Sequence, residues 1–507
     1  MTTDTRLRAT SAEVAACTRL SDALTAEYLE EHGVLPLALR DDAVVVATWR
    51  DRVDVHALDT LEHLFRRRVE LAACGEDDAR AAIRRVYADE ATAQSVIAGL
   101  DAGPLGAAES ERALDDLVHQ ANEAPVVRLV NLLLLEALEA RASDVHLEGY
   151  AHGLRVRYRV DGVLQDVSAP PAHLMPAVVS RLKIMAELDI AERRVPQDGR
   201  IRLRLQDRPV DVRVSTLPTL RGESLVLRLL DKERGGRVAL SGLGMSDETL
   251  AAFARAVSRP HGIVLATGPT GSGKTTSLYA AVDHIRTGRE KILTVEDPVE
   301  YELDGVPQVQ INEKVGVTFP TALRALLRQD PDVLLVGEIR DEETAEIATH
   351  AALTGHLVLS TLHTNDAPGA LTRLFDLGVA PYLVASTVEA VLAQRLVRTC
   401  CRECGEATPV TSLELAGLGA ENGTLDRVVR GRGCESCRGT GYRGRTGIYE
   451  LLVMDDELRG ELHLHRDAGR LRQEAVRKGM RTLRADGLRL VREGVTTPEE
   501  ILRVTRA

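Results

Sequence analysis

The segment GPTGSGKTT, residues 268–276, restricts the fold of this chain more than any other stretch. The apolar run IVLAT (263–267) before it has the composition of a strand, and the run TTSLYAAVDHI after it has the character of a helix. The segment matches the pattern G-x-x-x-x-G-K-[ST]. Its glycines let backbone N–H groups converge on phosphate oxygens, and the helix adds the partial positive charge of its N-terminus. We therefore predict a phosphate-binding P-loop between a strand and a helix.

The P-loop pattern assigns chemistry to particular side chains. We expect Lys274 to contact the β- and γ-phosphates of a nucleoside triphosphate and Thr275 to ligate Mg²⁺. The residues expected to surround the phosphates with them are Gly268, Pro269, Thr270, Gly271, Ser272, Gly273 and Thr276. A glycine-rich turn that binds nothing is the alternative, which the flanking strand and helix disfavour. The chain has no N-K-x-D guanine signature, so we expect ATP rather than GTP.

Four short, nearly all-apolar runs alternate with helical stretches in this part of the chain, namely GIVLAT, KILTVED, VLLVGEI and HLVLSTLH. This alternation is typical of a parallel sheet that is buried on both faces. Two of the runs end in carboxylates. We expect Glu338 to approach Mg²⁺, directly or through water, and Glu296 or Asp297 to act as a general base towards the attacking water. A solvated strand end is the alternative for each position.

Two histidines, His356 and His363, lie on and just after the last of these strands. A histidine in such a place is often a hydrogen-bonded core residue. It can equally donate to a γ-phosphate and lose that contact on hydrolysis. The spacing alone leaves both interpretations open.

Length and charge restrict the class of protein. A chain of 507 residues is too long for one core, so several domains are expected. The net charge of −12 disfavours broad, sequence-independent binding of nucleic acid. The N-terminus lacks a signal-peptide pattern, and the most apolar run (129–138) is short and contains Glu136. We therefore expect a cytoplasmic protein without a nucleic-acid partner, whose contact with a membrane is indirect or peripheral.

Five of the seven cysteines fall within 38 residues, in the segments CREC (401–404) and CESC (434–437) with Cys400 beside the first. Two C-x-x-C knuckles can close a tetrahedral Zn²⁺ shell, which is a structural arrangement without an open position. The predicted ligands are Cys401, Cys404, Cys434 and Cys437. Spacing favours Cys401 over Cys400, and reduced knuckles without metal are the alternative.

Shifts in pattern along the chain divide it into blocks. Alternating strands with hairpin turns predict a small α+β domain ahead of the P-loop. The predicted units are an N-terminal domain (1–100), a linker (101–119), the α+β domain (120–240), the P-loop domain (241–395), the tetracysteine module (396–440) and a C-terminal helical region (441–507).

Four segments in order resemble the secretion ATPases of the type II/type IV superfamily: GPTGSGKTTSLY, VEDPVEY, LRQDPDVLLVGEIRDEET and TGHLVLSTLHTNDA. The resemblance covers about residues 120–455 and includes ERRVPQDGRIRLRL in the α+β block. VLRLLDK (226–232) and the tetracysteine module look most like the type II secretion ATPases. The resemblance implies a multidomain α/β protein. Its RecA-like motor domain would follow a PAS-like α+β domain and an N-terminal α/β docking domain, and would carry a zinc-binding tetracysteine insertion.

The resemblance also implies roles that spacing does not show. VEDPVE looks like the Asp box, with Glu296 as the catalytic base, and VLLVGEIRD looks like an atypical Walker B with Glu338 near Mg²⁺. Both histidines fall in the His box, which favours phosphate sensing. Four arginines match positions implicated in contacting the nucleotide, closing the lobes or contacting a neighbouring subunit, namely Arg213, Arg228, Arg324 and Arg340. A surface ion pair is the alternative for each arginine.

As a family member the protein would be a homo-hexameric ATPase that uses ATP, Mg²⁺ and Zn²⁺. It would power type II protein secretion across the outer membrane by driving pseudopilus assembly. Its N-terminal domain would dock on the cytoplasmic domains of inner-membrane platform proteins. A type IV pilus extension motor is the main alternative, and a DNA translocase is disfavoured by the charge. A module that binds a cyclic dinucleotide is a further alternative, although residues 1–95 lack an Arg-Leu-Gly-type motif.

Overall fold

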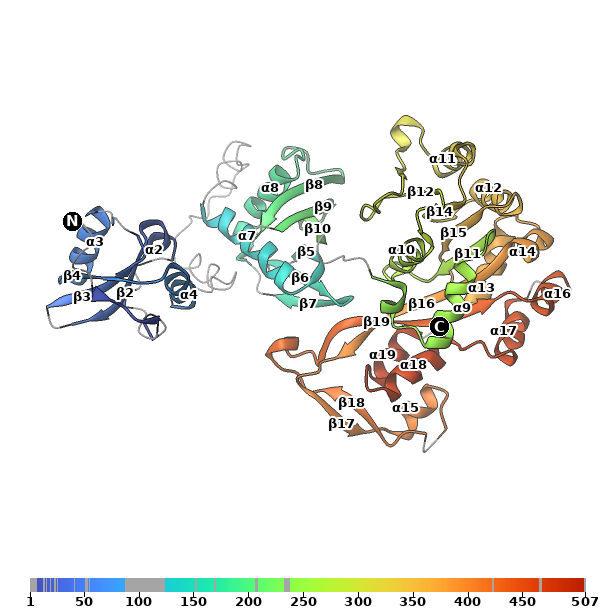
Figure 1. The fold of residues 1–507 in the computed structure, drawn as a ribbon. Coiled ribbons are helices and arrows are strands. Elements are labelled where there is room, and N and C mark those ends of the chain that lie inside the picture. Colours follow the sequence, from blue (N-terminus) through green and yellow to red (C-terminus); the bar gives the residue numbers. More distant parts are fainter. Residues whose placement is uncertain are drawn as a thin grey trace.

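The protein is represented by a computed structural model in which three sheet-containing domains follow one another along the chain (Figure 1). It describes residues 7–86 and 124–505, apart from short gaps at 12–13, 15, 19, 22–23, 25, 41, 51–52, 54, 151–152, 168–169, 206–207, 232–237, 422–423 and 465–466. The predicted linker (101–119) lies outside the described residues. Within those ranges, every helix is too short or too polar to cross a membrane.

The N-terminal domain is a small α/β unit. Its four-stranded sheet has the order β1-β4-β3-β2, and its central pair, β3 and β4, is parallel. The strands are β1 (Leu7–Arg8), β2 (Val34–Leu39), β3 (Ala43–Thr48) and β4 (Arg68–Ala73). The helices are α2 (Ala26–His32), α3 (Val55–Phe65) and α4 (Glu76–Val86). Strand β3 is buried along its whole length because residues of α2, α3 and α4 share its core.

The middle domain is a six-stranded antiparallel sheet with the order β7-β6-β5-β10-β9-β8. The strands are β5 (Ala142–Tyr150), β6 (Gly153–Val160), β7 (Val163–Val167), β8 (Gln197–Leu205), β9 (Arg208–Thr219) and β10 (Gly222–Asp231). Helices α7 (Ala124–Glu139) and α8 (Met175–Met185) share one apolar core with alternate residues of these strands. The period-two pattern therefore leaves the other face of the sheet to charged residues, many of them arginines.

The P-loop domain contains a seven-stranded sheet with the order β13-β12-β14-β15-β11-β16-β19. Its first six strands are parallel, and β19 is antiparallel at the edge. The strands are β11 (Gly262–Thr267), β12 (Ile292–Glu296), β13 (Gln308–Gln310), β14 (Val333–Val336), β15 (Leu357–Leu362), β16 (Val388–Cys400) and β19 (Tyr442–Val453). The helices beside it are α9 (Asp247–Val257), α10 (Lys274–Ile285), α11 (Phe319–Leu326), α12 (Glu342–Leu353), α13 (Ala367–Asp376) and α14 (Pro381–Thr387). Two core clusters, which share the strands of this sheet, bury both of its faces.

The sheet of the P-loop domain continues beyond the boundary that we predict after residue 395. Strand β16 runs through that boundary, and β19 brings residues 442–453 into the same sheet. The region 441–507 is therefore not helical throughout. Its helices begin after β19 and are α16 (Asp456–Leu464), α17 (Ala468–Arg477), α18 (Leu483–Arg492) and α19 (Pro498–Thr505). The arginines and glycines of β19 give it no clear strand pattern in the sequence, and it forms a strand by pairing with the distant segment β16.

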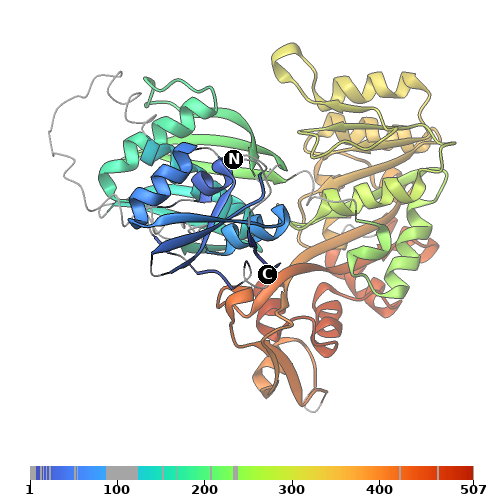
Figure 2. The same ribbon diagram turned by 60° about the vertical axis from the view of Figure 1, so that its left-hand side comes forward.

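Between β16 and β19 the chain forms the tetracysteine module. A two-stranded antiparallel hairpin, β17 (Gly405–Pro409) and β18 (Arg427–Gly431), encloses the short helix α15 (Ser412–Gly417). In both views the middle and P-loop domains lie side by side, and the orange segment that carries β16 and β19 reaches beneath the middle domain (Figures 1 and 2). There the backbone N–H of Gly444 donates to Asp161 of the β6–β7 turn at 2.8 Å.

Candidate functional site

The P-loop connects the carboxyl end of β11 to the first turn of α10, as predicted. Gly268 and Gly273 have φ values of 149° and 89°, which side chains rarely adopt. A Cβ atom on Gly268 would approach the Gln394 carbonyl oxygen to 2.6 Å and Ser272 Oγ to 2.7 Å. The loop is therefore compact, and a larger residue at 268 would displace it from β16.

Lys274 lies inside this loop and is only 9% exposed. Its Nζ donates to the carbonyl oxygens of Gly268 at 2.8 Å and Pro269 at 3.0 Å. Burial lowers the pKa of Lys274 to about 8, with the charge of Glu338 opposing the shift and that of Arg395 adding to it. The ammonium is thus a buried cation held by neutral carbonyls, a suitable partner for an anionic ligand.

A second observation at the loop also fits a phosphate ligand. The Ser272 hydroxyl is buried and has no hydrogen-bond partner. Buried polar atoms in native proteins are normally paired, so an unpaired hydroxyl at a P-loop is consistent with a ligand oxygen. Thr275 and Thr276 follow in the first turn of α10. The residues therefore fit the predicted nucleotide.

Glu338 and His363 come together at the carboxyl ends of β14 and β15, which are neighbours of each other in the sheet. His363 Nε2 lies 3.4 Å from Glu338 Oε2, and Arg340 Nη2 lies 2.6 Å from Glu338 Oε1. Glu338 is 9% exposed, and its charge acts on Lys274 across the site. The structure thus groups Lys274, Glu338, His363 and Arg340 at one edge of the sheet. A carboxylate next to a histidine and two cations could orient a water molecule or hold a metal ion.

Glu296 lies in different surroundings, although the sequence assigns it the role of catalytic base. It is 3% exposed and accepts hydrogen bonds from the Tyr279 hydroxyl, Thr294 Oγ1 at 2.7 Å and Gln308 Nε2 at 3.0 Å. These bonds connect α10, β12 and β13. No described contact joins Glu296 to Lys274. In this arrangement both carboxylate oxygens are occupied, and the predicted role stays a prediction.

The neighbouring carboxylate, Asp297, acts on Arg340, which is the ion-pair partner of Glu338. The pKa of Arg340 is raised chiefly by its hydrogen bond to Glu338, against burial, with a smaller contribution from the charge of Asp297. Asp297 and Arg340 also line one cavity of about 650 Å³. Of the three acidic residues in the VEDPVE segment, Glu296, Asp297 and Glu300, Asp297 is therefore the one whose charge acts on Arg340, the partner of Glu338.

His356 is not at this site in the same chain. It precedes β15 at the amino end of the strand, whereas His363 follows the carboxyl end. Seven residue steps along the strand, at roughly 3.3 Å each, place the two about 23 Å apart. His356 Nδ1 instead pairs with the Ala351 carbonyl oxygen at 2.9 Å. In this chain His356 is therefore a hydrogen-bonded residue away from the P-loop. Of the two histidines, His363 is the one that lies on the same side of the sheet as Glu338.

The four predicted arginines lie in three places. Arg213 and Arg228 are cross-strand partners on the charged face of the middle sheet, and Arg228 Nε donates to Asp144 at 3.0 Å. Arg324, on α11, pairs with Glu343 on the domain surface. Only Arg340 reaches the group around Glu338. Among the described contacts none joins Arg213, Arg228 or Arg324 to the P-loop.

Sequence reasoning missed two residues at the P-loop, Gln394 and Arg395. Gln394 Nε2 donates to the Ser272 carbonyl oxygen at 2.8 Å, and Arg395 is buried beside Gly268. Their only sequence signal is a polar pair that interrupts the apolar run VEAVLAQRLV. A buried strand that contains an arginine indicates a special partner for that charge.

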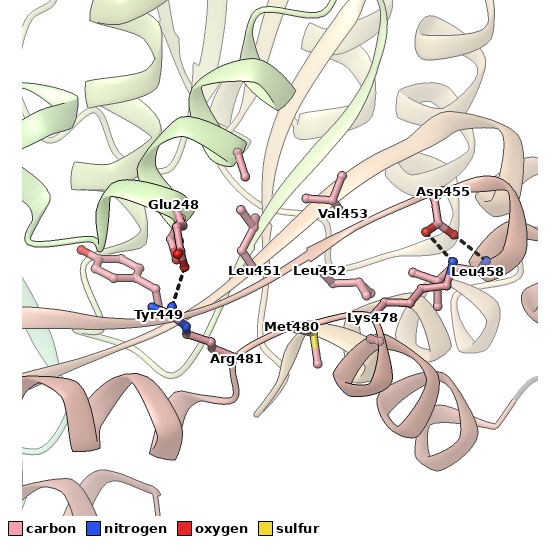
Figure 3. Close-up of a pocket in the computed structure, with 14 residues that line it drawn as sticks. Glu248, Tyr449, Leu451, Leu452, Val453, Asp455, Leu458, Lys478, Met480 and Arg481 are labelled. Carbon is pink, nitrogen blue, oxygen red and sulfur yellow. Dashed lines mark hydrogen bonds and ion pairs between the residues drawn. The ribbon is translucent and has the colours of Figure 1, made fainter.

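A cavity of about 750 Å³ opens between the first turn of α10 and the middle domain. Gly273 and Thr276 of the P-loop side, Tyr301, and Leu229 of β10 contribute to its lining. Its size is in the range of ligand-binding cavities, so it offers room for a nucleotide held at the P-loop. A smaller cavity of about 300 Å³, between α9, β19 and residues 478–481, contains no predicted site residue (Figure 3).

The four predicted metal-ligating cysteines form a compact cluster. Their sulfur atoms all lie within 4.8 Å of one another, and the Cys401–Cys434 and Cys404–Cys437 pairs are each 3.8 Å apart. Four sulfurs around Zn²⁺ at about 2.3 Å would be about 3.8 Å apart, so the arrangement fits this ion. Cys400 Sγ instead faces the Val429 carbonyl oxygen at 3.3 Å. Cys400 is therefore outside the cluster, as the spacing favours.

Comparison with known proteins extends this picture. Residues 119–503 match the type II/IV secretion system protein family, and residues 6–93 match the MshEN domain. Type II secretion system protein E of Pseudomonas aeruginosa is 49% identical over 484 residues, which cover 94% of this chain and 95% of that protein. The type IV pilus assembly ATPase PilB of Myxococcus xanthus is 44% identical over 481 residues, which cover 94% of this chain and 85% of that protein.

Two solved structures share the fold. The Legionella pneumophila ATPase DotB has a TM-score of 0.54 at 20% identity and covers 74% of this chain and 95% of its own. The pilus retraction motor PilT with bound ADP has a TM-score of 0.50 at 24% identity and covers 74% of this chain and 97% of its own. The predicted fold class, a multidomain α/β protein with a RecA-like motor domain, is confirmed. The chain belongs to the type II/IV secretion system protein family.

Proposed function

We propose that this protein is the ATP-hydrolysing motor of a type II secretion system, which works at the cytoplasmic side of the inner membrane and drives pseudopilus assembly. The observation that carries the proposal is its 49% identity, over 94% of the chain, to a type II secretion system protein E. The grouping of Lys274, Glu338 and His363 supplies the chemistry that such a motor needs.

In the proposed cycle Lys274 and the backbone N–H groups of the P-loop hold the phosphates of ATP, whose charge replaces the neutral carbonyl partners of the ammonium. Thr275 would hold Mg²⁺ directly, and Glu338 would approach the ion through a water molecule. When bound, that ion neutralises charge that develops on the phosphates. His363, next to Glu338, donates to the γ-phosphate and loses this contact after hydrolysis.

We assign the water-orienting carboxylate to Glu338, with Asp297 nearby, in preference to Glu296. Glu338 acts on Lys274 and contacts His363 and Arg340. Glu296 has both oxygens engaged in a buried network. In this assignment Glu296 fixes α10 against β12 and so keeps the P-loop helix in place.

The remaining predictions complete the proposed machine. A homo-hexamer would bring the charged face of a middle domain, with Arg213 and Arg228, to a nucleotide as the lobes close. The N-terminal domain would dock on cytoplasmic parts of the inner-membrane platform. The tetracysteine cluster would hold structural Zn²⁺, because four sulfurs leave no open coordination position.

A type IV pilus extension motor is the second candidate, since PilB is 44% identical over a similar length. The two candidates share the ATPase site and differ in the machine that it drives.

A Lys274→Ala variant tests both parts of the proposal. Without the ammonium, the purified protein should lose ATP hydrolysis by at least about 100-fold while it remains folded. Cells that carry the variant should retain hydrolases that are normally secreted and should still display surface pili. Loss of pili with intact secretion would replace the proposal by the pilus motor. Unchanged hydrolysis would refute the ATPase site itself.

A further inference from the structure

The residues Gln394 and Arg395 lie against the P-loop because of the length of β16. Strands β11 and β16 pair in parallel as far as Thr267 and Ala393. There β11 ends and turns into the P-loop, but β16 continues to Cys400. The two residues that follow Ala393 therefore run alongside the loop and not alongside a strand.

Gln394 braces the loop from this side. Its Nε2 donates to the Ser272 carbonyl oxygen at 2.8 Å, and its own carbonyl oxygen lies 2.6 Å from the position that a Cβ of Gly268 would take. The Gln394 side chain is buried, and its Oε1 has no partner. One residue of β16 thus holds the P-loop by a hydrogen bond at Ser272 and packs closely against it at Gly268.

Arg395 connects the same strand to the loop that follows His363. Its Nη2 donates to the Asn365 carbonyl oxygen at 3.0 Å and to Asn365 Oδ1 at 3.2 Å, while Nη1 donates to the Gln394 carbonyl oxygen at 3.0 Å. Nη1 also lies 3.1 Å from the Cβ position of Gly268. One guanidinium therefore touches both the His363 loop and the backbone next to the P-loop.

All of these partners of Arg395 are neutral. The side chain is 9% exposed, and among the described contacts it has no ion pair. Burial lowers its pKa, and the charges of Asp366 and Glu450 oppose that shift without contacting it. Arg398, three residues further along β16, is neutralised in the usual way, because its guanidinium lies 2.5 Å from the carboxylate of Glu500. A buried arginine without a carboxylate is costly unless an anion arrives from elsewhere.

We propose that Arg395 is a positioning residue for ATP binding and hydrolysis, which fastens the His363 loop to β16 beside the P-loop and keeps an unneutralised charge near Lys274. The proposal rests on the proposed ATPase function. Before ATP binds, the two buried cations repel each other, and the phosphates of the substrate remove that cost. The neutral Asn365 is part of this arrangement, because a carboxylate in its place would neutralise the guanidinium permanently.

Three variants of the full-length protein separate this role from a merely structural one. Arg395→Gln removes the charge and the fork of donors. Arg395→Lys keeps the charge but not the fork that grips Asn365. Asn365→Asp gives the guanidinium an acidic partner. Arg398→Gln is the matched control, since it removes a partly buried arginine from the same strand and takes from Glu500 one of the two arginines that pair with it, the other being Arg503.

The readouts are the affinity for the non-hydrolysable ATP analogue AMP-PNP, kcat and KM for ATP, and the midpoint of thermal unfolding. We expect Arg395→Gln to weaken binding about tenfold or more and to lower kcat. Arg395→Lys should restore most of the affinity but not kcat, because the His363 loop is no longer held. Asn365→Asp should raise or preserve the unfolding midpoint while it weakens binding. Arg398→Gln should lower the midpoint without a change in affinity.

The decisive result is an unfolding midpoint of Asn365→Asp that is unchanged or higher together with a weaker affinity for AMP-PNP. If the contact were purely structural, the midpoint and the affinity would change in the same direction. The proposal is overturned if Asn365→Asp binds the analogue as tightly as the wild type, or if Arg395→Gln binds it within twofold. It is also overturned if the affinity of all four variants simply follows their unfolding midpoints. If the wild-type protein itself does not bind the analogue, the proposed ATPase function fails and this inference fails with it.

Discussion

The P-loop and the tetracysteine cluster are both assembled from separate segments, but their side chains are arranged for different kinds of ligand. At the P-loop, two buried cations have only neutral partners among the described contacts, and the buried Ser272 hydroxyl has none, so the site is incomplete without an anion. At the cluster, four sulfurs face one another within 4.8 Å. The arrangement at the P-loop suits a ligand that binds and dissociates in each cycle. The arrangement at the cluster suits a structural ion that remains bound.

This contrast predicts that the cluster controls local stability and the P-loop controls turnover. Structural zinc contributes about 10–16 kcal/mol of apparent binding free energy in zinc-finger peptides. Replacing Cys404 with Ser should therefore release the metal and unfold the module, seen as loss of bound zinc and a lower unfolding midpoint. Affinity for AMP-PNP should stay within about threefold, because none of the described contacts of the cluster involves a residue of the P-loop.

Cys400→Ser is the matched control for that experiment. Its sulfur faces Val429 and lies outside the cluster, so zinc content should not change. Loss of zinc in Cys400→Ser would show that the cluster has been assigned the wrong ligand. A large fall in nucleotide affinity in Cys404→Ser would show that the two sites are not separate.

The same contrast can be drawn within the motor, between Glu338 at the open site and Glu296 in a closed network. Glu338→Gln should lower kcat about 100-fold with little effect on nucleotide affinity, because it removes a charge that orients the attacking water. Glu296→Gln should cost about 1–3 kcal/mol of stability by mismatching donors in a buried network, with kcat within about tenfold of the wild type. Steady-state hydrolysis and chemical unfolding of both variants test this. A larger loss of kcat in Glu296→Gln would restore Glu296 as the base.

The sequence predicts those parts of the site whose residues are close together in the chain or end consecutive strands of the sheet. The P-loop, its strand and its helix are contiguous, so one motif predicts all three. Glu338 and His363 each end an apolar run, and parallel strands bring such ends to the same edge. His356 shares a motif with His363, but a whole strand separates them, so proximity in sequence is misleading there.

Other features depend on pairing between distant segments and leave little local signal. Arg395 meets the P-loop only because β16 lies beside β11, more than 100 residues away in the chain. Strand β19 joins the sheet through β16 although its sequence, YRGRTGIYELLV, reads as polar for half its length. The hydrogen bonds of Glu296 with Tyr279 and Gln308 likewise unite three elements. A single sequence without homologues does not reveal such contacts.

The smallest predicted effect uses pH to separate the two sites. The pKa of Lys274 is lowered to about 8 by burial, and this ammonium is the group that must be charged to hold phosphate. Below pH 8 the free protein carries the charge. As pH rises through 8 the charge is lost, so affinity for AMP-PNP should fall by up to about tenfold per pH unit. Zinc at the cluster should be retained over the same range, since metal-bound sulfurs are deprotonated.

The charged groups around Lys274 make this prediction sharper. Glu338 raises its pKa and Arg395 lowers it, while Arg340 and His363 contact Glu338. Arg395→Gln should therefore move the fall in affinity to higher pH even though it weakens binding at neutral pH. Binding titrations between pH 7.5 and about 9.5, with zinc content measured in parallel, provide the test. A flat affinity across this range would mean that phosphate binding does not depend on a buried lysine with a lowered pKa, and that the P-loop is less closed than its contacts imply.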